Sequence, residues 1–565
     1  MKPATKNKPN IYFILALVVL LAQFFLQIYL AKHDSQTTDE GVHLASGYTY
    51  LMRSDFRFNP EHPILVKMLA AFPLIFLKIN TPSDWQYWDH ASDFFRDYYK
   101  EARDYGEQFL YNLGNNAEQI LFWGRIPIAS LAFILGFLIY YIVSVKTNAK
   151  YGFLATVLYA TNPIVNAHSH YVTTDIAAAL GFLLTIYTFV NYIKNKNTKN
   201  FLCFCFAFAF ALLSKYTAII LFPIIVAIIF LYYIYFLQTK KIDFWAFTKK
   251  SIFVIVIIWL IVNAVYFFQF SPMPSGSVLQ NSISQIQGQK AEIYQAYLDK
   301  YQAFYDVSRH LLMPNYYIKG LGMMVFHTQV GQDSFLLGQS SNMGWWYYFP
   351  VLFLLKNYII FIILFILSIV YFYRAKKKDF FVSAILVSFV IYFIFAMLSK
   401  ANIGVRHILP AIIMVIVFIP LQLFHSGILK KFKFIFWLII ALSILETTLI
   451  FPNYISYFNQ LCGGSSNGYK IAGDSNLEWG QDLKDIKKYI EENNISEPYI
   501  EYFWDGLSSL DYYGIKYKFA SDIDVNNPKG YLVIGASARE KKEFQWLKKY
   551  TVYDRINYSV FVYKF

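Results

Sequence analysis

The chain has 565 residues, of which 57% are hydrophobic, 20% aromatic and only 15% charged, and its formal net charge is +14. Soluble proteins average about 25% charged residues, so this composition excludes an ordinary soluble domain and indicates a polytopic membrane protein. The positive charge is not clustered on a soluble segment, which argues against a nucleic-acid partner.

Long apolar runs predict eleven membrane-spanning helices, because a helix needs about 20 apolar residues to cross a bilayer. Nine runs are clear and two are short, near 151–165 and 201–214. The clear runs are 11–31, 120–145, 171–193, 216–237, 251–270, 349–373, 380–398, 405–424 and 433–451. No small-residue cleavage site follows 11–31, so this run is expected to be an anchor rather than a signal peptide.

Charge asymmetry decides the status of 63–79, an apolar stretch that carries lysines and a proline. If it does not span, the N-terminus and five connecting loops share one side, with 19 Lys and Arg against two acids. That asymmetry is the positive-inside pattern, so we expect 63–79 to lie on the outer surface and the N-terminus to be cytoplasmic. The expected location is the plasma (inner) membrane.

The outer face then carries three large segments, 32–120, 271–348 and 452–565. The last is much less apolar, with a helical pattern over 478–493 and strand-like runs at 530–535 and 558–563. We therefore expect an α-helical membrane module over 1–451, with surface helices in its first outer loop. A small extracytoplasmic α/β domain is expected over 452–565.

Two adjacent carboxylates, Asp39 and Glu40, follow the first predicted span. A carboxylate pair near hydrocarbon is costly unless it has a function, so we interpret Asp39 as a catalytic base with Glu40 beside it. The alternative is an ordinary pair of solvated loop carboxylates.

Other polar residues fall at the same predicted face: Glu61, His62 and Lys67 before and within 63–79, and His170 and Asp175 at the turn before the fourth span. Glu61 and Asp175 could simply be favourable charges at helix N-termini. Their shared side and depth favour one site with Asp39. A metal site is disfavoured, because the histidines lack the spacing of ligands on one helix.

Lys215, Arg406 and His407 form a second group at the outer ends of predicted helices. Cations on this side break the positive-inside rule. They either snorkel to lipid headgroups or form a clamp for a phosphate.

An aromatic cluster, Trp345, Trp346 and Tyr347, precedes the run 349–373. Such clusters usually form the interfacial belt of a membrane protein. Stacking against a sugar ring is the alternative.

Taken together, these segments resemble the family 39 type of GT-C glycosyltransferases, which includes protein O-mannosyltransferases and the aminoarabinose transferases of lipid A. The matching segments are Asp39-Glu40, Glu61-His62-Pro63 with Lys67, Thr173-Thr174-Asp175, Gly344 to Pro350 with Lys356, Gly404 to Pro410, and Asn467 to Leu483. The chain departs from the family at Ile64, where a second proline is common, and at Glu478, where Asp is more usual.

The resemblance implies inverting transfer of a sugar from a polyprenyl-phosphate donor to an acceptor hydroxyl at the outer face. Asp39 would be the general base, and Glu40 or Asp175 would orient the acceptor or tune that base. The donor phosphate would be held by Lys215, Arg406, His62 and Lys67. Substrate contacts would come from Glu61, His170, Trp345, Trp346, Tyr347 and His407.

No cofactor or metal is implied by this resemblance. The expected partners are the donor lipid, membrane lipids, and a lipid, glycan or protein acceptor. The rival hypotheses are a multi-pass transporter, a glycan ligase or polymerase that uses a lipid-diphosphate donor, and a non-catalytic assembly subunit.

Overall fold

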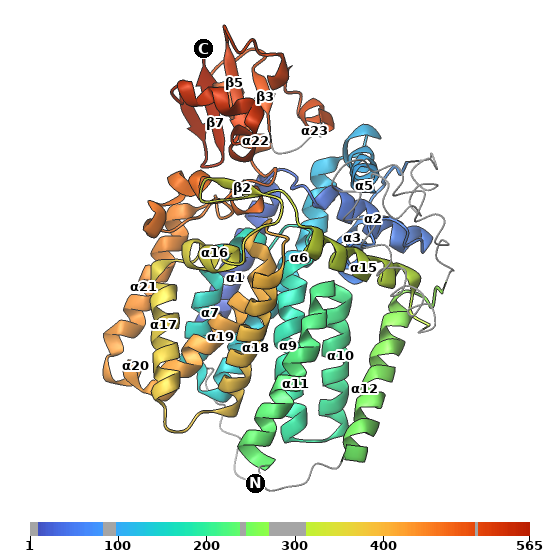
Figure 1. Cartoon of the computed structure of the whole chain (residues 1–565), viewed down its shortest axis with the longest axis vertical. Coiled ribbons are helices and arrows are strands. Elements are labelled where there is room, and N and C mark those ends of the chain that lie inside the picture. The colour runs from blue at the N-terminus through green and yellow to red at the C-terminus, as the bar shows by residue number, and fades with distance from the viewer. Residues whose placement is uncertain (1–9, 83–97, 238–243, 271–311, 503–506) are drawn as a thin grey trace.

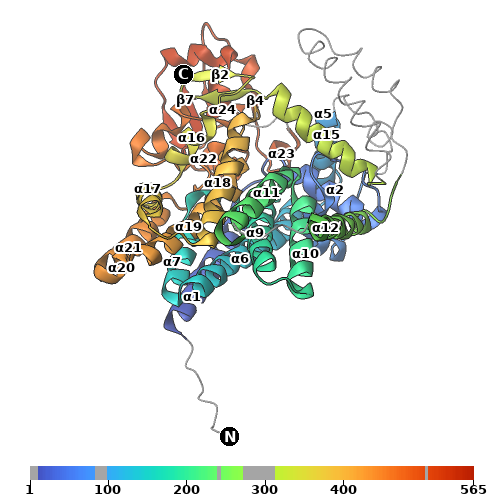
Figure 2. The same cartoon turned by 60° about the horizontal axis from the view of Figure 1, so that its bottom comes forward.

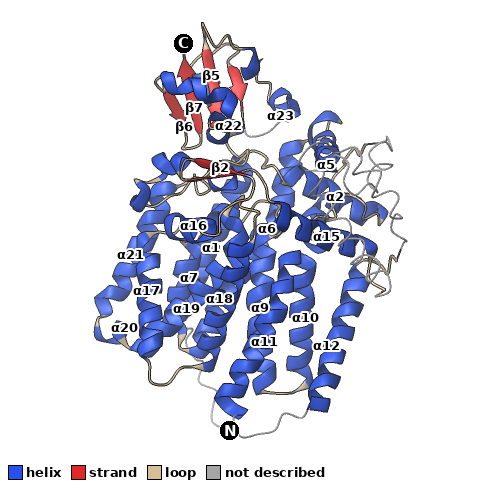
Figure 3. Ribbon diagram, in the orientation of Figure 1, coloured by secondary structure: helices blue, strands red, loops and turns tan. Residues whose placement is uncertain are grey.

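The computed structural model describes residues 10–82, 98–237, 244–270, 312–502 and 507–565. A bundle of long helices carries a small β-sheet beyond one of its ends (Figures 1 and 3). The predicted class, a polytopic helical protein with a small C-terminal sheet region, is confirmed.

Within the described residues, seven helices are long and apolar enough to cross a membrane, or eight if one bent pair counts as a span. Five of them are α1 (Ile11–His33), α6 (Ala117–Lys146), α9 (Asp175–Lys194), α18 (Phe380–Leu398) and α21 (Lys433–Ile450). The sixth, Tyr216–Phe236, runs through η3 (Tyr216–Ile220), α11 (Leu221–Tyr232) and η4 (Tyr233–Leu237). The seventh joins η6 (Val405–Ile408) to α19 (Leu409–Ser426). The chain is a membrane protein. The remaining predicted spans are shorter helices, α7 (Ala149–Ala160), α10 (Thr198–Ser214) and the apolar part of α12 (Phe244–Val265).

The predicted continuous span over 349–373 is wrong. The segment breaks into α16 (Tyr348–Lys356) and α17 (Ile359–Arg374), which are bent by 115°. The buried Lys356 ammonium donates hydrogen bonds to the carbonyls of Ile455 and Asn476, both at 2.6 Å. A charged side chain inside an apolar run needs such partners, and here they come from the segment after the last span.

Short helices gather at the end of the bundle that faces the sheet (Figure 1). They are α2 (Glu40–Arg53), α3 (Ile64–Ala71), η1 (Phe72–Phe76), α5 (Tyr98–Glu107), η2 (Gln108–Asn112), α8 (Pro163–His168) and α15 (Asn315–Val330). Gly47 allows α2 to pack directly on α3, because a Cβ at this position would lie 2.2 Å from the carbonyl oxygen of Lys67. Of the segment 271–348, which the sequence predicted to lie outside, the part 271–311 is not among the described residues.

The C-terminal segment forms a five-stranded sheet of order β4-β3-β5-β7-β6. Its strands are β3 (Tyr499–Glu501), β4 (Lys518–Phe519), β5 (Tyr531–Gly535), β6 (Asp554–Ile556) and β7 (Val560–Lys564). β3 pairs in parallel with β4 and β5, whereas β7 is antiparallel to β5 and β6. Its helices are α22 (Leu483–Glu492), α23 (Leu507–Tyr512) and α24 (Ala536–Arg539). The strands predicted at 530–535 and 558–563 are thus present, and the helix predicted over 478–493 begins only at Leu483.

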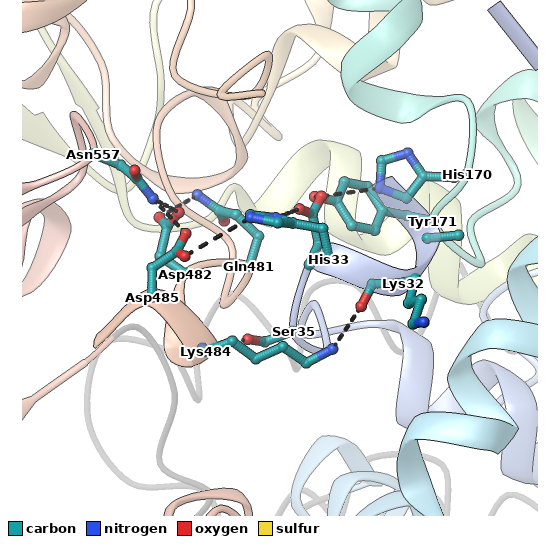
Figure 4. A network of polar contacts seen from close by, with 12 residues as sticks. Lys32, His33, Ser35, His170, Tyr171, Gln481, Asp482, Lys484, Asp485 and Asn557 are labelled. Atoms are coloured by element: carbon teal, nitrogen blue, oxygen red, sulfur yellow. Dashed lines mark hydrogen bonds and ion pairs between the residues drawn. The ribbon is translucent and has the colours of Figure 1, made fainter. Parts of the chain in front are cut away.

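A polar network joins this sheet region to the helical bundle (Figure 4). Asp34, directly after α1, contacts His33 at 2.9 Å and His170 at 3.1 Å. On the other side of the junction, Asp482 accepts a hydrogen bond from Asn557 at 2.7 Å. The His33 ring lies 3.8 Å from Asp485 and so connects the two halves of the network.

Two carboxyl groups at this junction make its stability depend on pH. Burial raises the pKa of Glu478 to about 8 and that of Asp482 to about 7. Between about pH 4 and pH 8 the folded protein therefore holds protons that the unfolded chain releases, so folding stability falls as the pH rises through this window. We expect Glu478→Gln to flatten the fall in melting temperature of the detergent-solubilised protein between about pH 5 and pH 8. An unchanged pH slope in this variant would contradict the role assigned to burial.

Candidate active site

Asp39 ends a loop that the C-terminal part of the chain holds in place. The backbone N–H of Ser35 donates to the carbonyl of Gln481, and that of Thr38 donates to the carbonyl of Trp479, both at 3.0 Å. The Asp39 side chain is 26% exposed, and α2 begins at the next residue. The loop thus presents a carboxylate that is fixed in position and still accessible.

Glu40 has a different environment, because its side chain is fully buried. The Arg125 guanidinium donates two hydrogen bonds to the Glu40 carboxylate, at 2.8 and 2.6 Å. The backbone N–H groups of Thr37 and Val172 donate to the same carboxylate at 2.9 and 3.0 Å. The other Arg125 donors bond to the carbonyls of Ala31, Asp34 and Ser35. Both Glu40 oxygens are therefore occupied. Glu40, for which the sequence predicted a catalytic part, thus contacts Arg125 and the backbone of the loop that ends at Asp39.

The predicted acids and cations meet in a chain of alternating charge. Arg406 Nη1 lies 2.8 Å from Asp39 Oδ2 and 3.8 Å from Asp175 Oδ2. Lys215 Nζ lies 2.5 Å from Asp175 Oδ1. These four residues come from the loop before α2, the start of α9, the end of α10 and η6, so tertiary packing assembles one cluster from four segments.

The segment after the last span supports this cluster from a second direction. The Trp479 ring lies 4.0 Å from the Arg406 guanidinium carbon, a cation–π contact. Asn476 Oδ1 accepts a hydrogen bond from the Val405 backbone N–H at 2.8 Å and fixes the turn that carries Arg406. Trp479 therefore contacts Arg406 through its ring and the Asp39 loop through its carbonyl.

A cavity of about 440 Å³ opens beside the cluster, between η3, α15 and α18. Its polar lining includes Glu61, His62, Lys215 and His407, which the sequence placed in one site. Thr328, Gln329, Gln332 and Ser399 add further polar groups, whereas Ile219, Ile220, Phe395 and Leu398 make one wall apolar. The cavity size is typical of small-molecule sites, and Lys215 connects it to the charge cluster.

The two histidines of the cavity contribute hydrogen-bonding groups. Burial lowers the pKa of His62 well below its usual value, which leaves its ring neutral near pH 7. The predicted cationic contact of His62 with a phosphate is thus corrected to that of a neutral donor or acceptor. Nε2 of His407 is buried and has no hydrogen-bond partner among the described residues, so it is available to a ligand.

Lys67 and His170 lie away from the cavity. The buried Lys67 ammonium donates to Asn59 Oδ1 at 2.9 Å and to the Tyr50 hydroxyl at 3.2 Å, and burial lowers its pKa. His170 is held between Gln27 at 2.9 Å and Asp34 at 3.1 Å. The structure therefore corrects both predictions: Lys67 ties α3 to the loop before it, and His170 belongs to the junction network.

The aromatic cluster also lies outside the cavity lining. Trp346 is 66% exposed, whereas Trp345 and Tyr347 are partly buried against the core. The neighbouring Phe349 does line the cavity. The stacking contact predicted for these three residues is therefore not part of this cavity, and their position fits the interfacial belt that was the alternative.

Sequence reasoning gave no role to Arg125, Trp479 or Tyr392. Arg125 is the only charged residue in its apolar run before Lys146, and this isolation could have indicated a buried ion pair. Trp479 belongs to the segment Asn467 to Leu483, which matches the family resemblance. Tyr392 lines the cavity and donates its hydroxyl to the His407 carbonyl at 2.7 Å. Among the described residues, no group of three His, Cys, Asp or Glu side chains is arranged to hold a metal ion.

Comparison with known proteins gives a family match for part of the chain. Residues 108–267 match the family model described as dolichyl-phosphate-mannose-protein mannosyltransferase, which confirms the GT-C resemblance over this segment. No curated protein matches the chain.

Three solved structures are similar over most of the chain. ArnT from Cupriavidus metallidurans in the apo state is 11% identical, with 98% of this chain and 97% of that chain covered and a TM-score of 0.47. The same protein bound to undecaprenyl phosphate is 10% identical, with 98% of both chains covered and a TM-score of 0.44. The Archaeoglobus fulgidus oligosaccharyltransferase in complex with zinc and sulfate is 14% identical, with 94% of this chain and 71% of that chain covered and a TM-score of 0.42.

Proposed function

We propose that this chain is a membrane glycosyltransferase that moves a sugar from a polyprenyl-phosphate donor to an acceptor hydroxyl, with inversion at the anomeric carbon. The reaction would take place at the outer face of the membrane, with the N-terminus cytoplasmic and the C-terminal sheet outside. The single observation that carries the proposal is the alternating chain Asp39–Arg406–Asp175–Lys215 beside a cavity with one polar and one apolar side.

Asp39 suits the part of the general base. Its side chain is held by Arg406 yet remains 26% exposed, so an acceptor hydroxyl can reach it. As the acceptor oxygen attacks the anomeric carbon, its proton passes to the Asp39 carboxylate, and the bond between that carbon and the phosphate oxygen breaks. Attack from the face opposite the leaving group inverts the configuration.

The leaving group is a lipid phosphate, and its developing negative charge needs a cation held in place. Lys215 lines the cavity and is held by the buried Asp175 carboxylate, so its ammonium is already oriented. Arg406 lies between Asp175 and Asp39 in the series of ion pairs and would add positive charge from the Asp39 side. The apolar residues of η3 and α18 in the cavity lining offer a route for a lipid tail into the membrane.

A transfer assay with the purified full chain tests this proposal against a panel of polyprenyl-phosphate sugars and hydroxyl acceptors. We expect release of polyprenyl phosphate and a product of inverted anomeric configuration for at least one donor. Lys215→Met should lower the rate by about 10²–10³-fold, because it removes the cation next to the leaving group. Lys400→Met is the matched control, since Lys400 lies close by but does not line the cavity. Full activity of Lys215→Met, or no transfer with any donor, would refute the proposal.

A further inference from the structure

A second groove lies at the opposite end of the same helix pair. Whereas the active-site cavity adjoins the start of the α11 segment and the end of α18, this groove is lined by Leu231 and Tyr235 on one side and Leu386, Val387 and Val390 on the other. α11 and α18 lie side by side in both views (Figures 1 and 2). The groove has a volume of about 410 Å³, which is within the range of small-molecule sites.

Apolar side chains dominate this groove, and its polar groups lie at one end. The Tyr235 hydroxyl and Ser383 Oγ, both in the lining, are 2.8 Å apart and form a hydrogen bond between the two sides of the groove. Phe372 and Tyr373, from the end of α17, form the third side. Lys378 also lines the groove, with its ammonium 5.0 Å from the Phe372 ring and 5.5 Å from the Tyr373 ring.

Positive charge surrounds the Lys378 end of the groove. The connection between α17 and α18 carries Arg374, Lys376, Lys377 and Lys378 but only one acid, Asp379, whose side chain caps α18 at the Val382 N–H. Lys146 and Lys194 lie over the Phe381 and Phe380 rings at 5.0 and 5.2 Å, just beside the same helix start. Within the described residues, Lys378 has no carboxylate at ion-pair distance.

We propose that this groove binds one anionic phospholipid, with an acyl chain between α11 and α18 and its phosphate against Lys378. Basic pockets between membrane helices are a common way to hold anionic lipid headgroups. An acyl chain matches the apolar walls, and a negative headgroup matches the positive charge of Lys378 at the groove's end.

The occupant is a separate lipid rather than the tail of the donor substrate. A donor in the active-site cavity has its phosphate near Lys215, at the other end of α11 from this groove. One lipid phosphate cannot lie at both ends of the helix pair. The anionic headgroup beside Lys378 therefore belongs to a second lipid. This lipid would support the α11–α18 packing that shapes the active-site cavity, and its binding does not depend on the proposed transfer reaction.

Native mass spectrometry of the detergent-purified full chain measures this binding directly. We expect phosphatidylglycerol to bind more tightly than phosphatidylcholine with the same acyl chains. Lys378→Gln should weaken phosphatidylglycerol binding by about fivefold, the effect of one lysine on an anionic headgroup. Lys377→Gln is the matched control, because Lys377 carries the same charge on the same connection but does not line the groove. Val387→Trp should block the groove and reduce phosphatidylglycerol binding to the level of phosphatidylcholine.

Three results would overturn this inference. Equal binding of the two lipids would remove the need for a charged headgroup. Equal effects of Lys378→Gln and Lys377→Gln would indicate diffuse surface charge instead of a site. Displacement of phosphatidylglycerol by undecaprenyl phosphate in wild type but not in Lys378→Gln would assign the groove to the polyprenyl lipid.

Discussion

Replacing Asp39 by asparagine is expected to reduce sugar transfer by about 10²–10⁴-fold, the usual contribution of a general base. The change keeps the shape of the side chain but removes its ability to take a proton from the acceptor. Donor binding should be retained, because Lys215 and its partner Asp175 remain in place. The loss should therefore appear in kcat, with little change in the KM for the donor.

Asp55→Asn provides the control for this experiment. Asp55 belongs to the same outer segment and pairs with Arg57 at 2.7 Å, but it does not contact the charge cluster. The Asp55→Asn variant should keep the wild-type rate, and cooperative thermal unfolding of both variants checks that each is folded. Wild-type turnover by a folded Asp39→Asn protein would mean that another group takes the proton, or that the site is idle.

Replacing Glu40 by glutamine is expected to destabilise the protein by about 3–5 kcal/mol, because it leaves the Arg125 guanidinium buried without its counter-ion. Arg125 is only 1% exposed and Glu40 is fully buried, so water cannot compensate for the lost charge. Thermal unfolding in detergent, followed by intrinsic fluorescence, measures this change. Activity at low temperature should fall as well, since the pair holds the loop that ends at Asp39.

A surface ion pair gives the contrast for this second prediction. Lys484 and Glu118 are 2.5 Å apart but 23% and 38% exposed. Glu118→Gln should therefore cost less than about 1 kcal/mol. Similar losses in the two variants would show that burial does not set the strength of the Glu40–Arg125 pair.

Several features of the site followed from the sequence because they depend on local pattern. Carboxylates and cations at the outer ends of apolar runs must lie near one face of the membrane, so Asp39, Asp175, Lys215 and Arg406 could be grouped before any fold was known. The three ion-pair distances that link them, 2.5, 2.8 and 3.8 Å, agree with that grouping. The catalytic parts assigned to these residues remain predictions.

The errors arose where a polar residue had two possible sets of partners. Lys67 and His170 occur in segments that approach the site, but their side chains turn to Asn59 and to Asp34. The prediction of a single span over 349–373 was wrong for a similar reason. Lys356 lies at the break in this segment and donates hydrogen bonds to the carbonyls of Ile455 and Asn476, about a hundred residues later in the chain. A hydropathy pattern shows that these residues are polar, but it does not show which groups will be their hydrogen-bond partners.

By itself, the sequence determined that the chain is a membrane protein, where most of its long apolar helices lie, and which charged residues follow or precede them. Burial of apolar helices and the spread of charge are properties of local composition, so no contact between distant residues is needed to infer them. Only the tertiary structure decided that Glu40 is the ion-pair partner of Arg125 while Asp39 stays accessible. It also decided that the Trp479 ring makes a cation–π contact with Arg406. The two pairings join residues 85 and 73 positions apart, and buried polar groups select such partners only when the whole chain has packed.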